Sequence, residues 1–219
     1  MSGGDGGFDH PIFRESIRRI RGLLGETGLE GVERELLERL VHSSGDPAIG
    51  TWLRFSPAAC ARGMEALAAG AVILTDTAMA ASAVAPMARR TFANPVHSVL
   101  DWAPAEAPAG GTRAAVGMER ALVAHPGAVV LVGSAPTALE LLLQRVRSGA
   151  PGGAPPPALV IGMPVGFVGV AESKRQLAAA DLPQIRLEGS RGGAALVAAA
   201  VNALLRRAWL DRPGGPPLP

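Results

Sequence analysis

His42, in the segment "LVHSSGD", is the residue whose type and position best suit proton chemistry. It ends a predicted helix and opens a polar turn. Histidine is the side chain that changes charge near neutral pH without a perturbed pKa, so a catalytic His42 would donate or accept protons. A histidine at the end of a helix also interacts favourably with the helix dipole, and a purely structural role is the alternative.

The remaining histidines and the cysteine give little indication of metal or redox chemistry. His10, His97 and His125 lack a comparable polar setting, and we expect surface or structural roles for them. No second histidine or carboxylate stands at metal-ligand spacing from His42, so a zinc site is not expected. A single cysteine, Cys60, excludes an internal disulfide and a cysteine-rich metal site.

A glycine-rich stretch, "GMPVGFVGVAESK", follows an apolar run and opens onto a polar helix. Its glycines, Gly162, Gly166 and Gly169, match neither the phosphate-binding loop nor the dinucleotide fingerprint, and Lys174 comes too late for the former. Apolar neighbours such as Phe167 favour packing against a large, flat organic ligand over contact with a pyrophosphate. The alternative is a tight strand-to-helix turn in which the glycines only permit close packing.

Two further segments place polar residues at predicted helix starts. In "GSAPTALELLL", Ser134 and Thr137 lie where free backbone N–H groups and the helix dipole favour a carboxylate, although capping by Thr137 explains the pattern equally well. In "GGTRAAV", Arg113 is a cation at a helix N-terminus, where the dipole opposes it. Because this position is electrostatically unfavourable, we expect a ligand-binding role for Arg113 more than for the other arginines.

Strands and helices are predicted to alternate along the chain. Short apolar segments predict strands at residues 71–76, 97–102, 128–133, 158–163 and 184–189. Helical periodicity and end signals predict helices at residues 13–24, 32–42, 56–70, 112–124, 137–147, 172–180 and 193–207. In the third helix, Ser56 is the expected N-cap, Pro57 the first helical residue and Gly70 the residue just past the end.

This alternation predicts an α/β fold with a doubly wound, parallel, five-stranded sheet and helices on both faces. Ligands of such sheets bind beyond the carboxyl ends of the strands, so functional residues should gather there. We expect one domain over residues 1–219, with flexible tails at 1–10 and 212–219. The Pro/Gly/Ala-rich segments "APAEAPAGG" and "GAPGGAPPP" are interpreted as connections within that domain.

Composition excludes several classes of protein. The formal net charge is only +2, the arginines form no basic run, and aromatic residues are 4% of the chain, which argues against a nucleic-acid-binding surface. Lys174 is the single lysine, and arginine forks suit carboxylates and phosphates. The N-terminus has no apolar signal core, and the most apolar C-terminal stretch is too short to span a bilayer, so we expect a cytoplasmic protein without a membrane segment.

Taken together, several segments resemble the precorrin-8X methylmutase family of cobalamin biosynthesis. They are, in the family's order, "FRESIRRIR", "LVHSSGD", "GAVILTDTAMA", "GTRAAV", "GSAPTALELLL", "GAPPPALVIGMPVGFVGVAESK" and "RGGAALVAAAVNALL". The resemblance covers nearly the whole chain, and the glycine-rich stretch is its most specific part. It implies that this stretch shapes a pocket for a corrinoid macrocycle and that no nucleotide is needed.

The resemblance also implies a fold, an assembly and a reaction. The fold is flavodoxin-like, and the protein is a homodimer with active sites near the subunit interface. The reaction moves a methyl group from C-11 to C-12 of a tetrapyrrole ring, without a metal or organic cofactor, to give hydrogenobyrinic acid or its cobalt form, cobyrinic acid. The position of the family's proton donor is matched by His42, and substrate-facing polar positions are matched by Ser16 and Arg113.

The chain departs from the family pattern before its last helix. In "EGSRGGA", Glu188, Ser190 and Ala194 stand where the family usually has Arg, Arg and Ser, while Gly192 and Gly193 can still bring backbone N–H groups towards an anionic substrate arm. Because the substrate carries many carboxylates, an acidic residue there would weaken its binding. The main alternative is therefore a catalytically weak relative that binds or carries corrinoids. An unrelated flavodoxin-like nucleotide binder is a further alternative, since one fold hosts many functions.

Overall fold

The computed structural model describes residues 9–149 and 153–212, so most of the two predicted tails and part of "GAPGGAPPP" lie outside the described residues. Its α-helices are α1 (Pro11–Leu24), α2 (Gly31–Ser44), α3 (Ala59–Ala68), α4 (Ala78–Arg90), α5 (Arg113–Ala124), α6 (Pro136–Ser148), α7 (Val170–Ala178) and α8 (Ala194–Asp211). Its strands are β1 (Leu53–Phe55), β2 (Ile73–Thr75), β3 (Val96–Ser98), β4 (Val129–Val132), β5 (Leu159–Gly162) and β6 (Gln184–Leu187). Two 3-10 helices, η1 (Pro47–Trp52) and η2 (Val99–Trp102), precede β1 and follow β3.

The strands of the described residues form one sheet in the order β1-β6-β5-β4-β2-β3. From β2 to β6 all pairings are parallel, and the order of these strands is that of a flavodoxin-like, doubly wound sheet, as predicted. The chain reverses its direction across the sheet between β2 and β4, which are neighbours. This reversal defines the switch point at which such sheets bind ligands.

The predicted number of five strands is wrong, because the sheet has six. The additional strand, β1, lies at the edge of the sheet and pairs antiparallel to β6, with Leu53 opposite Leu187 and Phe55 opposite Ile185. With three residues, β1 is too short to give a periodic signal in the sequence. The predicted strand at 97–102 is also shorter, because Ser98 accepts a hydrogen bond from the Leu100 N–H at 3.3 Å and starts η2.

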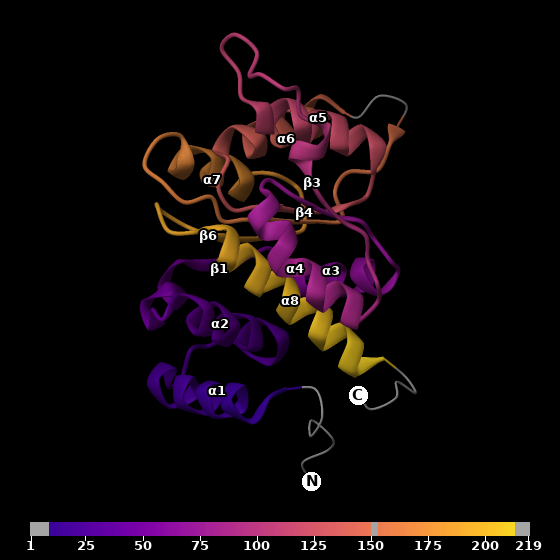
Figure 1. The fold of residues 1–219 in the computed structure, drawn as a ribbon. Helices are drawn as coiled ribbons and strands as arrows, with labels where there is room; N and C mark the ends of the chain where they lie inside the picture. The colour runs from indigo at the N-terminus through magenta and orange to yellow at the C-terminus, as the bar shows by residue number, and fades with distance from the viewer. Residues whose placement is uncertain (1–8, 150–152, 213–219) are drawn as a thin grey trace.

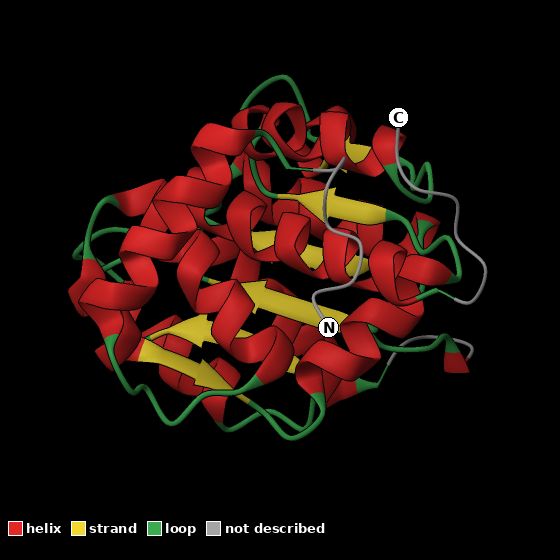
Figure 2. Cartoon of the chain, turned by 90° about the horizontal axis from the view of Figure 1, so that it is seen from below, coloured by secondary structure: helices red, strands yellow, loops and turns green. Residues whose placement is uncertain are grey.

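Helices cover both faces of the sheet (Figure 1). α5, α6 and α7 lie on one face and α3, α4 and α8 on the other, while α2 and then α1 pack outside α8. Figure 2, a view from below, shows the second set of helices in front of the strands. β4 and β5 are buried along their full length, which explains their continuous apolar sequences.

The predicted cap of the third helix is wrong. α3 begins at Ala59, and its N-cap is Ala58, which adopts a left-handed backbone conformation with φ of 57°. The Ser56 hydroxyl instead accepts a hydrogen bond from the Gln184 N–H at 2.9 Å, which fastens this segment to β6. Gly70 does follow the helix end, with φ of +84°.

α8 is the central helix of its face, in contact with α2, α3 and α4. It is 18 residues long and buried along most of its length. Two of its polar side chains link it to its surroundings: the Asn202 amide donates to the Ala83 carbonyl at 3.2 Å, and Arg206 is held by two carboxylates. Among the described residues, no helix is both long and apolar enough to cross a membrane.

Candidate active site

The loops that follow the parallel strands are joined to one another at the carboxyl edge of the sheet. Backbone hydrogen bonds connect the β5–α7 loop to the β4–α6 loop at 3.2 Å and to the β6–α8 loop at 3.1 Å. Asp46, just after α2, lies 3.6 Å from the guanidinium of Arg191 in the β6–α8 loop. The end of α2, which contains His42, is therefore part of the edge where doubly wound sheets bind ligands.

His42 lies in the last turn of α2 with its side chain exposed. Its Nδ1 atom is 2.8 Å from the Oγ of Ser16 on α1, so the structure brings these two predicted site residues together. The Phe13 ring meets the imidazole edge-on, with 5.0 Å between ring centroids. These two contacts fix the ring, and Nε2 has no hydrogen-bond partner among the described residues, which leaves it available to a ligand.

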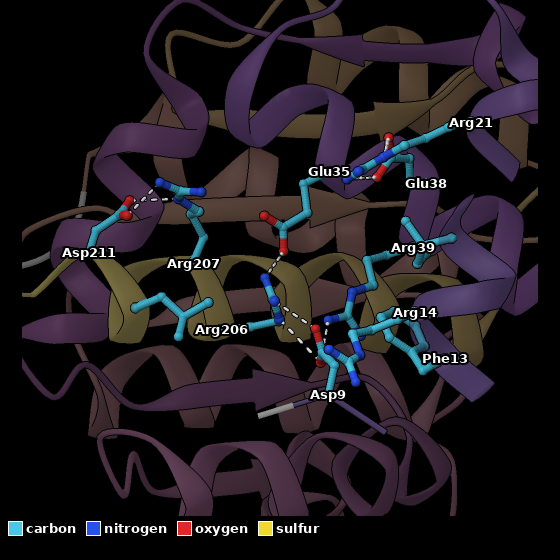
Figure 3. Close-up of a pocket in the computed structure, with 12 residues that line it drawn as sticks. Asp9, Phe13, Arg14, Arg21, Glu35, Glu38, Arg39, Arg206, Arg207 and Asp211 are labelled. Carbon is cyan, nitrogen blue, oxygen red and sulfur yellow. Dashed lines mark hydrogen bonds and ion pairs between the residues drawn. The ribbon is translucent and has the colours of Figure 1, made fainter. Parts of the chain in front are cut away.

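A charged cleft of about 500 Å³ lies between α1, α2 and α8, and Phe13 is part of its wall (Figure 3). Several of its charged groups pair with each other: Arg206, for example, lies 2.6 Å from Asp9 and 2.7 Å from Glu35. The Arg39 guanidinium stacks on the Phe13 ring at 4.0 Å. These contacts dock α1 onto α2 and α8, and so support Phe13 and Ser16 behind the imidazole.

Asp76, at the end of β2, occupies the switch point of the sheet. Its Oδ2 accepts hydrogen bonds from the N–H groups of Ser134 and Ala135 at 2.6 and 2.7 Å, at the N-terminus of α6. Burial raises the pKa of the Asp76 carboxyl, and the backbone N–H groups oppose that shift. The helix start predicted to bind a carboxylate thus binds one from the protein itself, so Ser134 can face a ligand only with its exposed side chain.

Thr137 on α6 contacts Thr112, the residue that precedes Arg113 at the start of α5. The Oγ1 atoms of Thr137 and Thr112 are 2.8 Å apart, and Thr112 caps α5 by accepting from the Ala115 N–H at 3.2 Å. Thr137 does not cap α6, whose N-cap is Ala135. The exposed Arg113 donates its Nε–H to the Pro104 carbonyl at 2.8 Å, which leaves its terminal nitrogens for an anion.

The glycine-rich loop presents apolar side chains to solvent. Phe167 is 96% exposed and Val168 is 87% exposed, although both are large and hydrophobic. Met79, in the first turn after β2, is 72% exposed, and Trp52, just before β1, is 37% exposed. Exposed apolar surface gathered at a ligand-binding edge indicates a large apolar ligand or a protein partner.

The glycines of this loop have different local roles. Gly169 is the left-handed N-cap of α7, and Gly166 adopts φ of +138°. Gly162, by contrast, is buried in β5, and a Cβ there would overlap the Leu177 side chain of α7. Gly162 thus permits close packing of β5 against α7, which was the alternative interpretation of this stretch.

Comparisons with known proteins agree with this arrangement. The model of the precorrin-8X methylmutase family matches residues 11–207. This chain belongs to that family. A precorrin-8X methylmutase of Pseudomonas aeruginosa is 44% identical over 88% of this chain and 93% of that protein, and a cobalt-precorrin-8 methylmutase of a Synechocystis species is 39% identical over 93% and 98%. The crystal structure of a precorrin-8X methylmutase from Thermus thermophilus superposes with a TM-score of 0.82 at 40% identity, covering 94% of this chain and all of that one.

Membership of the methylmutase family makes the departures in "EGSRGGA" informative. Glu188 is paired: its carboxylate lies 3.0 Å from Arg54 on β1 and 3.6 Å from Arg186 on β6. Arg191, which is also close to Glu188 in sequence, pairs with Asp46 instead. The Glu188 charge is neutralised within the protein, so it does not oppose a substrate carboxylate as an isolated anion would.

Sequence reasoning missed two buried charged residues of this methylmutase edge. Asp76 is 1% exposed and Lys174 is 2% exposed. The available signals were an aspartate directly after an apolar strand and the single lysine in a chain otherwise rich in arginine. Within the described residues, no group of three or more His, Cys, Asp or Glu side chains is arranged to hold a metal ion.

Proposed function

We propose that this chain is an isomerase of cobalamin biosynthesis that moves a methyl group from C-11 to C-12 of precorrin-8X, with His42 as the proton donor. Family membership supports the reaction. The observation that carries the site is the exposed His42 ring, held through Nδ1 by Ser16 at the ligand-binding edge of the sheet. The product is hydrogenobyrinic acid, or cobyrinic acid when the ring holds cobalt, and the enzyme acts in the cytoplasm.

In this proposal His42 enters the reaction as an imidazolium. Its Nδ1–H donates to the Ser16 hydroxyl, and its Nε2–H faces the macrocycle. Protonation of the conjugated ring withdraws electron density and lowers the barrier to migration of the methyl group with its bonding electrons, a contribution of roughly 10²–10⁴-fold. The neutral imidazole then takes a proton back, so substrate and product are isomers that differ in the position of the methyl group and of the ring double bonds.

Two groups of residues are proposed to hold the substrate. Carboxylate arms meet the Arg113 guanidinium, the polar side chains of Ser134 and Thr137, and the backbone N–H groups around Gly192 and Gly193. The apolar face of the macrocycle packs on Phe167, which is 96% exposed, and on the turn from Gly166 to Gly169.

An absorption assay tests the proposal. Purified protein is mixed with precorrin-8X or with cobalt-precorrin-8, because relatives carry both names, and the spectrum is followed with time. Conversion of either substrate is the expected result. Tight binding without a spectral change would support the carrier alternative, which family membership does not favour, and would overturn the proposed reaction.

We also propose that the enzyme is a homodimer, on the basis of the family resemblance. The exposed Phe167 and Val168 side chains are the kind of surface that a second subunit covers together with a ligand. Sedimentation at micromolar concentration is expected to give twice the chain mass of 22.3 kDa. A fully active monomer would contradict a site shared between subunits.

Restoring the family's arginines at positions 188 and 190 is expected to have different effects at the two positions. Ser190 is exposed on the loop, so Ser190→Arg adds a cation near the substrate arms and should tighten product binding by about tenfold at low salt, less at high salt. Glu188→Arg would place a third cation beside Arg54 and Arg186, and should lower the melting temperature without a gain in affinity. Titration of both variants with product at two salt concentrations, with thermal melts, measures the difference; tighter binding by Glu188→Arg would refute this account of the ion pairs.

A further inference from the structure

The only lysine of the chain is buried beneath the loop between β6 and α8. Lys174 lies on α7 and is 2% exposed, whereas the chain uses arginine at its other 20 basic positions. Its ammonium group donates to the Gly189 carbonyl at 2.9 Å and to the Arg191 carbonyl at 2.6 Å. No carboxylate of the described residues pairs with it, and burial lowers the pKa of Lys174 to about 8.

These two contacts set the direction in which the loop presents its backbone. In a trans peptide the C=O and N–H groups point in opposite directions. Carbonyls of Gly189 and Arg191 that point inward to the ammonium therefore direct the N–H groups of Ser190 and Gly192 outward. Within the described part of the chain, neither of these N–H groups has a hydrogen-bond acceptor.

The carbonyl between these two is held by the glycine-rich loop. The Ser190 oxygen accepts from the Gly166 N–H at 3.1 Å, and the Arg191 N–H has no acceptor among the described residues either. Three successive N–H groups then lead into the N-terminus of α8, whose N-cap, Gly193, supplies no side-chain cap. Successive N–H groups without acceptors can bind an anion, and the buried ammonium adds positive charge behind them.

We infer that Lys174 is a positioning residue of the methylmutase: its ammonium group turns the backbone N–H groups of Ser190 and Gly192 towards a carboxylate arm of the corrinoid. The inference rests on the proposed function, because it assigns a way of binding to that substrate. Lysine suits this place because a compact ammonium can donate to two carbonyls in a narrow interior, whereas a planar guanidinium needs a wider space.

Lys174→Met, which keeps the length and apolar stem of the side chain, tests this inference. Without the ammonium the carbonyls are no longer drawn inward, so the dissociation constant of the polycarboxylate product should rise about tenfold or more. Turnover at saturating substrate should change much less, because His42 lies on another element. The matched control is Arg175→Met, which removes the next cation on α7, an exposed side chain paired with Glu172 at 2.9 Å, and should bind product like the wild type.

A second measurement needs no variant. Because the chain contains one lysine, protein grown with ¹³Cε-labelled lysine gives one side-chain resonance. Saturating product is expected to shift this resonance and to raise the pKa of Lys174, since a nearby carboxylate favours the charged ammonium. An unchanged resonance would overturn the inference even if Lys174→Met failed to fold.

The outcomes also separate this inference from the proposed function. Wild-type protein that converts precorrin-8X, together with a Lys174→Met variant that binds product equally well, would overturn only the role of Lys174. Wild-type protein that neither converts nor binds a corrinoid would overturn both. A variant with weaker product binding, nearly normal turnover at saturation and an intact control would support both.

Discussion

His42→Ala is expected to bind the corrinoid product within about tenfold of the wild type while its turnover falls by roughly 10²–10⁴-fold. The imidazole is exposed and its Nδ1 is occupied by Ser16, so only Nε2 is free to transfer a proton to the ring. Alanine removes that proton donor but leaves the apolar loop and the anion-binding groups in place. Turnover by absorption and product binding by titration measure the two effects separately.

His10→Ala is the matched control for this variant. His10 is also an exposed histidine at a helix end, where its Nδ1 accepts from the Ile12 N–H at 3.2 Å and caps α1. Its loss should cost helix stability of about 1 kcal/mol and leave turnover nearly unchanged. Parental turnover by His42→Ala would show that the proton comes from another group.

Ser16 provides a graded version of the same test. Ser16→Ala keeps the imidazole but removes the oxygen that fixes its Nδ1 at 2.8 Å. Since the ring also contacts Phe13, it keeps part of its orientation, and the loss of turnover should be smaller than that of His42→Ala. The comparison distinguishes the group that transfers the proton from the group that orients it.

The parallel sheet could be predicted because its signals are local. β4 and β5 are continuous apolar runs, and burial on both faces selects such sequences. β1 could not be predicted, because three residues have no period and become a strand only by pairing with β6. For the same reason Ser56, which has the sequence pattern of a cap, instead accepts a hydrogen bond from Gln184, far along the chain.

A property of a candidate site residue could be predicted from sequence only where the segment around that residue determines it. The apolar, exposed character of Phe167 could be read from its own loop. The partners of charged groups could not, because they come from distant elements: Glu188 is held by Arg54, and the helix start at Ser134 is filled by Asp76. Resemblance to a family transfers positions, but the charge of each position depends on such partners.

Gly192→Ala is expected to damage the site most among changes that leave the chemical groups intact. A Cβ at Gly192 would overlap the carbonyl oxygen of Met163, the same oxygen that accepts the Gly193 N–H at 2.9 Å. The loop must therefore move away from β5 and lose that hydrogen bond. Overpacking of this kind costs about 1–3 kcal/mol of stability, and a displacement of the substrate-binding N–H groups by an ångström costs on the order of 10²-fold in kcat/KM.

A second glycine-to-alanine variant distinguishes the effect of the Gly192 overlap from the effect that alanine has at any helix or loop position. Gly22→Ala makes the same change in α1, where nothing lies within 4 Å of the added methyl group, and should raise helix stability by up to about 1 kcal/mol without changing kcat/KM. Thermal melts and steady-state kinetics on both variants give the comparison. If Gly192→Ala kept parental kcat/KM, the loop between β6 and α8 would not hold the substrate, and both the anion site and the role of Lys174 would fall with it. A loss confined to Gly192→Ala would instead place the carboxylate-binding N–H groups at the junction of β5, α7 and α8, where the methylmutase brings them together.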